Sequence, residues 1–103
     1  MSNIYYNPED FGLEVIETID TGGSYEFDML VIWKDKDNNL YYAQDSGCSC
    51  PTPFEDFEGI PSLTRITKEG FESFKSELKG HTDLEVTEYM STVEKVKKLL
   101  EAE

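Results

Sequence analysis

Positive charge is scarce in the first sixty residues. They contain 13 acidic residues and only two basic ones, Lys34 and Lys36, for a net charge of −11. Residues 61–103 hold nine acids and seven bases, so they carry only −2 of the chain's −13. Because contacts with phosphate and anionic lipid need lysine and arginine, direct binding to nucleic acid or to a membrane is disfavoured. A basic protein partner, including one that itself binds nucleic acid, suits this charge, and the alternative is that the charge only maintains solubility.

Long hydrophobic runs are also missing. No apolar run reaches the ~18 residues that a spanning helix needs, and the first ten residues lack a basic-then-apolar leader. We therefore expect a cytoplasmic protein whose thiols stay reduced. The chain shows no internal repeat, linker or low-complexity tract, so residues 1–103 predict a single domain. It also lacks a recognisable triad or phosphate loop, which favours a protein that is not an enzyme.

Alternation of apolar and polar residues predicts an antiparallel sheet within residues 11–66. The first strand is expected over Phe11–Asp20, although adjacent Ile16 and Glu17 break its alternation. Tyr25–Lys34 is the clearest strand, and its second half is apolar on both sides, which is typical of a central strand covered on both faces. Polar residues 35–39 then predict a hairpin to a third strand over Leu40–Gln44, and residues 63–66 favour a short fourth strand.

Two helices are predicted after the sheet, over residues 67–79 and 83–102. Thr67 is a good N-cap for the first, and Gly80 ends it. Apolar residues recur every 3.5 residues or so in the second helix, a stripe that suits packing on the sheet or a homodimer contact. The fold class is therefore α+β: a three- to four-stranded antiparallel β-meander with one face covered by two C-terminal α-helices.

The candidate partner-binding residues are carboxylates of the strands and of the loop that follows the third strand. Four of them are expected to line one face of the sheet. The full set is Glu14, Asp20, Glu26, Asp28, Asp45, Glu55 and Asp56. A solvated strand face, a surface that copies a phosphate backbone, an acid–base pair for glycoside hydrolysis and a hard-cation site are alternative readings of the strand acids.

The most unusual segment is the loop Asp45-Ser-Gly-Cys48-Ser-Cys50-Pro-Thr-Pro-Phe54. It contains both cysteines of the chain, and two thiolates one residue apart can bind a soft metal such as zinc. The candidate metal ligands are Cys48, Cys50, Asp45 and His81, the single histidine. Redox chemistry is a further alternative, although the spacing is not Cys-x-x-Cys and nearby acids raise thiol pKa values. Otherwise the cysteines are small buried residues of a tight loop, and no cofactor is needed.

Two segments carry a resemblance to a known group of proteins. They are Tyr5-Tyr-Asn-Pro-Glu9-x-Phe11-Gly-Leu-Glu14 and Asp45-Ser-Gly-Cys-Ser-Cys-Pro-Thr-Pro-Phe-Glu-Asp56. This pattern resembles a family of small acidic proteins encoded by actinobacterial bacteriophages, a family without an assigned activity. The resemblance implies a phage origin and action inside an infected cell, and it favours binding to a host or phage protein. It assigns no catalytic or binding residue.

Overall fold

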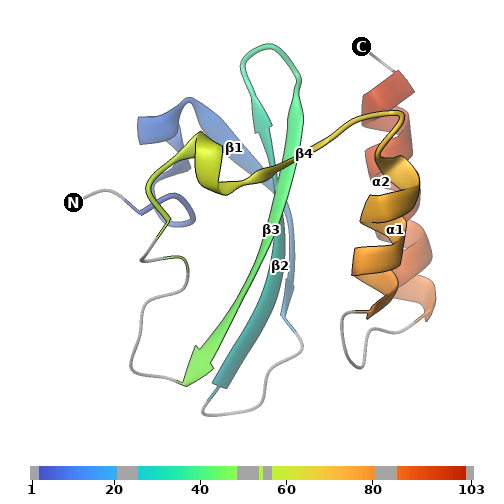
Figure 1. Cartoon of the computed structure of the whole chain (residues 1–103), viewed down its shortest axis with the longest axis horizontal. Helices are drawn as coiled ribbons and strands as arrows, with labels where there is room; N and C mark the ends of the chain where they lie inside the picture. Colours follow the sequence, from blue (N-terminus) through green and yellow to red (C-terminus); the bar gives the residue numbers. More distant parts are fainter. Residues whose placement is uncertain (1–2, 21–25, 49–53, 55–56, 81–85, 102–103) are drawn as a thin grey trace.

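The computed structural model describes residues 3–20, 26–48, 54, 57–80 and 86–101. Four antiparallel strands lie in the order β1-β2-β3-β4 (Figure 1), and two α-helices follow them. The elements are η1 (Pro8–Phe11), β1 (Leu13–Asp20), β2 (Glu26–Asp35), β3 (Leu40–Cys48), η2 (Ile60–Ser62), β4 (Thr64–Ile66), α1 (Phe71–Gly80) and α2 (Val86–Glu101). The predicted α+β class, with a β-meander and two C-terminal helices, is confirmed.

Strand β2 is the buried centre of the sheet. From Met29 to Trp33, its side chains are 5%, 0%, 0%, 0% and 0% exposed. Successive side chains of a strand point to opposite faces, so a fully buried run needs a covering layer on each face. The sequence predicted this double burial from the apolar run.

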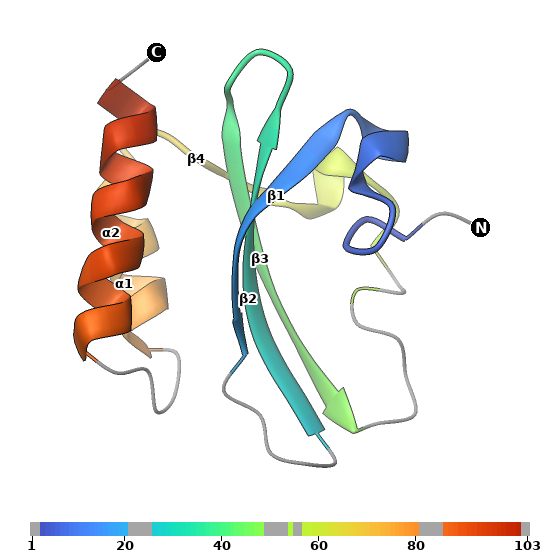
Figure 2. The same cartoon turned by 180° about the vertical axis from the view of Figure 1, so that it is seen from behind.

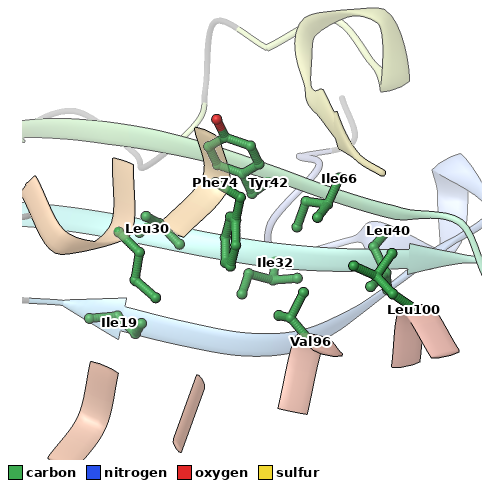
Figure 3. Close-up of a cluster of buried hydrophobic side chains, with 10 residues drawn as sticks. Ile19, Leu30, Ile32, Leu40, Tyr42, Ile66, Phe74, Val96 and Leu100 are labelled. Carbon is green, nitrogen blue, oxygen red and sulfur yellow. The ribbon is translucent and has the colours of Figure 1, made fainter. Parts of the chain in front are cut away.

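The two helices cover one face of the sheet (Figure 1). Ile32 of β2 and Tyr42 of β3 meet Phe74 of α1 and Val96 of α2 in this core (Figure 3). The rings of Tyr42 and Phe74 pack edge to face, with centroids 5.2 Å apart. The buried members of this cluster are Ile19, Leu30, Ile32, Leu40, Tyr42, Ile66, Phe74, Leu78, Val96 and Leu100.

A second core covers the opposite face of the sheet, the one that the two helices do not cover. It is built from the N-terminal segment and from residues that follow β3, which lie on the side of the sheet away from the helices (Figure 2). Its buried members are Ile4, Leu13, Met29, Val31, Trp33, Ala43 and Phe54. The indole N–H of Trp33 donates to the carbonyl oxygen of Ile4 at 3.0 Å, which ties the N-terminal segment to β2. The middle of neither sheet face is therefore open for a display of acids.

Strand β1 begins later than predicted and is irregular. Phe11 belongs to the 3-10 helix η1, and Gly12 ends that helix with φ of 75°, a value that favours glycine. Within β1, the register shifts between Val15 and Glu17, so Ile16 is the extra residue of a β-bulge. The broken alternation at Ile16 and Glu17 in the sequence is the signal of this bulge.

A lysine of α2 binds the backbone and a side chain of β1 at the bulge. The ammonium group of Lys95 donates to the carbonyl oxygen of Ile16 at 2.6 Å and lies 3.2 Å from a carboxylate oxygen of Glu17. A bulged edge strand with a bonded carbonyl is a poor template for pairing with another chain. This contact also joins the C-terminal helix to the first strand.

Helix α1 begins four residues after its predicted start at residue 67. Thr67 still caps the segment, because its hydroxyl accepts the N–H of Gly70 at 2.9 Å. Gly70 then provides the carbonyl that bonds to the N–H of Phe74 at 3.0 Å. Helix α2 begins at Val86 and ends at Glu101. Neither helix within the described ranges is long and apolar enough to cross a bilayer.

Removing the ring of Phe74 should destabilise the fold strongly. Phe74 is 1% exposed in the core between α1 and the sheet, and Phe→Ala at such sites costs about 3–5 kcal/mol. The free energy of unfolding of Phe74→Ala, measured by urea denaturation, should fall by that amount. Ser73→Ala, at the exposed neighbouring position, is the control and should change it by less than about 0.5 kcal/mol. Equal stability of the two variants would contradict the packing described here.

Candidate functional site

Acidic residues gather at the end of the sheet where β1 and β3 finish and β2 begins, the lower end in Figure 1. Asp20 and Asp45 both pair with Met29, one from each neighbouring strand. Asp28, the preceding residue of β2, pairs with Ser46. We call Asp20, Asp28 and Asp45 the acidic end. The backbone of Glu26 pairs with that of Cys48 two residues further out, and the side chains of these two residues lie outside the described set.

The sequence places no lysine or arginine near this end along the chain. Residues 1–33 and 37–64 contain none, and the two bases between them lie at the other end of β2. Asp20 and Asp28 also interact with each other, because the backbone N–H of Asp28 donates to the Asp20 carboxylate at 3.2 Å. The acidic end is therefore an organised part of the sheet terminus, with carboxylates from three adjacent strands.

The four strand acids do not share one face, contrary to the expectation. Residues that pair directly across antiparallel strands lie on the same face, so Asp20 lies on the face of Met29. Asp28 is the neighbour of Met29 in β2 and therefore belongs to the other face. The cause is the bulge at Ile16, because one extra residue moves the later part of a strand to the opposite face.

Glu14 lies at the other end of the sheet. It pairs with Lys34, and the carboxylate and ammonium groups are 3.9 Å apart on an exposed surface. Both line an open hollow of about 320 Å³ together with Glu9, Asp35 and Lys36. Glu14 therefore does not join the acidic end, and this hollow mixes charges of both signs.

Asp45 holds the chain that follows β3. One carboxylate oxygen accepts the backbone N–H of Phe54 at 2.7 Å, and the other accepts the N–H of Ser46 at 3.0 Å. Both oxygens therefore stabilise backbone near the end of β3. Charge-assisted hydrogen bonds of this kind are stronger than neutral ones. Sequence reasoning assigned Asp45 to a partner or a metal and missed this anchoring role.

Phe54 is the anchored residue and the centre of an aromatic cluster. It is 0% exposed and has φ of 62°, a left-handed conformation that bulky residues rarely adopt. Its ring packs edge to face on Trp33 and on Phe57, with centroid distances of 5.4 Å and 4.9 Å. Phe54 is therefore a buried member of the second core, and Phe57 packs against that core.

The predicted metal ligands lie mostly outside the described residues. This holds for Cys50, for His81 and for the side chain of Cys48, as it does for the predicted partner-binding residues Glu55 and Asp56. Among the described side chains, no group of three or more metal-ligating residues comes together. A zinc site and a redox role for the thiols both stay predictions.

A network that the sequence reading did not select lies in the β2–β3 hairpin. The carboxylate of Asp35 accepts the backbone N–H groups of Asp37 and Asn39, the side-chain amide of Asn39 and the hydroxyl of Tyr41, at 2.9–3.0 Å. Arg65 of β4 donates to the amide oxygen of Asn39 at 2.6 Å, which links the hairpin to the edge strand. The signal was the Asp-x-Asp-x-Asn spacing of residues 35–39, which places a carboxylate at the start of a turn, where it can accept backbone N–H groups.

These hydrogen bonds set the protonation of Asp35. Partial burial raises its pKa, but the hydrogen bonds from Asn39, Tyr41 and Asp37 outweigh burial and leave the pKa below the ordinary value of 3.8. Burial and the bond to Asp35 both raise the pKa of Tyr41. The hairpin therefore contains an ionised carboxylate that is committed to structure.

Comparison with known proteins gives a family and no activity. A family model described as "Domain of unknown function (DUF7574)" matches residues 2–103. No curated protein and no solved structure matches the chain. The match agrees with the expectation of a family without an assigned activity, and a phage origin stays a prediction.

Removing the Asp45 carboxylate should release the segment that it holds. Asp45→Ala leaves the N–H of buried Phe54 without its acceptor, and losses of this kind cost about 1–3 kcal/mol. The free energy of unfolding should fall by that amount, and Asp45→Asn, which keeps one acceptor oxygen, should lose less. Asp37→Ala makes the same chemical change at an exposed position and is the control. If Asp45→Ala and Asp37→Ala were equally stable, Asp45 would not be an anchor.

Asp35→Asn should change the pH dependence of stability. A carboxylate with a lowered folded pKa stabilises the fold above its unfolded pKa of 3.8, and this contribution disappears as pH falls through the lower folded value. We expect the variant to be about 1–2 kcal/mol less stable at neutral pH, with the difference shrinking below about pH 4. Urea denaturation of both proteins over a pH series measures this. A difference that is constant with pH, or that grows in acid, would be contrary to the assignment.

Proposed function

The chain belongs to the DUF7574 family, and we propose that it is a non-enzymatic interaction protein that binds a basic segment of another protein at the acidic end of its sheet. Support comes from the strand register, which gathers Asp20, Asp28 and Asp45 from three adjacent strands. In line with the bacteriophage resemblance, the proposed partner is a basic or nucleic-acid-binding protein of the host or the phage, met in the cytoplasm.

The covered faces of the sheet support this location. Helices occupy one face and the Trp33–Phe54 core occupies the other, so neither middle region is open to a partner. The acidic end lies where β1 and β3 terminate and β2 begins, with Asp20 exposed and Asp28 and Asp45 half-buried. Like-signed carboxylates at one place favour a partner with lysine and arginine, and they disfavour phosphate-rich or anionic surfaces.

The Cys-Pro loop is the second part of the proposed contact. It starts at the acidic end, because β3 finishes at Cys48, and it carries Glu55 and Asp56 with no base between residues 37 and 64. Asp45 anchors the far part of this segment through Phe54. In this proposal Asp45 acts mainly by positioning the loop, whereas Asp20 and Asp28 act through their charge.

Two matched double variants test the proposal. Asp20→Asn with Asp28→Asn removes two charges at the acidic end and keeps an acceptor at each position. Glu72→Gln with Glu77→Gln removes two charges from exposed positions on α1. The probe is a fluorescent lysine- and arginine-rich peptide, and binding is measured by anisotropy over a series of salt concentrations.

We expect the Asp20/Asp28 variant to bind about three- to tenfold more weakly, equivalent to about 0.7–1.4 kcal/mol, with a shallower dependence on salt. The Glu72/Glu77 variant should bind like wild type, because its charges lie on α1 and not on the three strands that form the acidic end. Equal weakening by the two variants would show that the peptide responds only to net charge. Binding that is indifferent to salt would equally count against the acidic end.

A further inference from the structure

The two α-helices form an apolar hollow at the end where α1 begins and α2 finishes. Its volume is about 220 Å³, and its lining consists of Lys68, Phe71, Lys97, Leu100 and Glu101. Phe71 supplies most of the apolar surface, because Leu100 is a buried member of the core and only 3% exposed. A cavity of about 150 Å³ accepts benzene, so this hollow has room for one aromatic ring.

The charge around the hollow differs from that of the rest of the molecule. Lys68, which precedes α1, and Lys97 of α2 line it, with Glu101 as the opposing charge. Lys68 also lines a neighbouring hollow with Arg65, Thr67 and Glu69, so a further base lies close to the first hollow. In a chain of net charge −13, this surface suits an occupant that combines an aromatic side chain with carboxylates.

Such an occupant is present in the N-terminal segment of the same sequence. Tyr6 is 58% exposed and is one of two large hydrophobic side chains that are exposed in the described part of the chain. Exposed Glu9 and Asp10 follow it in η1. The neighbouring Tyr5 packs on the core of the opposite sheet face and holds the segment in place, with its ring 5.0 Å from that of Tyr6.

The segment cannot reach the hollow of its own molecule, because the N-terminal segment and the helices lie on opposite sides of the sheet (Figures 1 and 2). We infer that Tyr6 and Glu9 of one copy dock into the Lys68–Lys97 hollow of a second copy, which gives a head-to-tail association. This inference concerns surfaces other than the acidic end and does not depend on the proposed function.

Net charge decides the orientation of this contact. Two bodies of −13 repel each other, but at physiological salt the Debye length is about 8 Å, so local charges dominate. A head-to-tail contact places the −11 half of one copy against the −2 half of the next, whereas a contact between two N-terminal halves brings like charges together. Because the two patches lie on opposite sides of the sheet, the contact leaves one patch free on each terminal copy, so it propagates as an open chain or closes into a ring.

Complementation between two defective variants tests the inference. Tyr6→Ala removes the aromatic anchor, and Lys97→Glu reverses the charge at the hollow, and both positions are exposed. Sedimentation velocity at physiological salt should show that the mass of wild type grows with concentration beyond a dimer. Each variant alone should need at least a tenfold higher concentration to associate. An equimolar mixture should form a one-to-one heterodimer and stop there, because only one functional contact remains.

Three controls separate this contact from other causes. Lys79→Glu makes the same charge change at the opposite end of α1 and should associate like wild type. Glu9→Lys is a second variant with a defective N-terminal patch, and mixing it with Lys97→Glu should also restore association. Met90→Ser, at the other exposed apolar residue, should have no effect. The inference would be overturned by a wild type that stays monomeric or by a mixture that does not associate. It would also be overturned if only Met90→Ser lost self-association, which would instead indicate a symmetric contact between α2 helices.

Discussion

The structure depends on the burial of strand β2 on both of its faces. Five consecutive residues, Met29–Trp33, are buried, and a strand of this kind is stable only between two apolar layers. Helices α1 and α2 supply one layer and the segments around Ile4 and Phe54 supply the other. Because the second layer contains only short 3-10 helices and irregular chain, it has to be fixed by individual contacts. The Trp33–Ile4 hydrogen bond and the Asp45–Phe54 hydrogen bond are two of these.

This constraint also decides where charge is displayed. A sheet with one solvated face can spread acids over that face, whereas this sheet leaves its ends and edges for them. The register collects Asp20, Asp28 and Asp45 at one end. At the other end, Glu14 meets Lys34, and Asp35 is engaged within the hairpin. Acids that looked equivalent in the sequence therefore have different roles: loop anchor, hairpin anchor, exposed partner of a lysine, and candidate contact surface.

Much of the fold could be predicted from the sequence, because the signals were local. The apolar run of β2, the polar hairpin after it and the helical spacing after Thr67 each define an element without tertiary information. The bulge at Ile16 was visible only as a broken alternation, and its consequence for Asp20 depends on a pairing register that one strand does not reveal. The role of Asp45 depends on a contact nine residues away, and that of Lys95 on a contact 79 residues away. The left-handed φ of Phe54 has no signature in residue type, since bulky residues rarely adopt it.

The described residues cover both faces of the sheet, and we propose that a basic partner binds at the acidic end. A nitrogen–proton correlation spectrum, recorded while a lysine- and arginine-rich peptide is added, tests this residue by residue. The account predicts that the largest shifts occur at the amides of residues 18–20, 28–30 and 44–48, and that the buried centre around Ile32 stays unchanged. Shifts that centre on the 35–39 hairpin or on the helices, or that are spread evenly over the exposed acids, would contradict it.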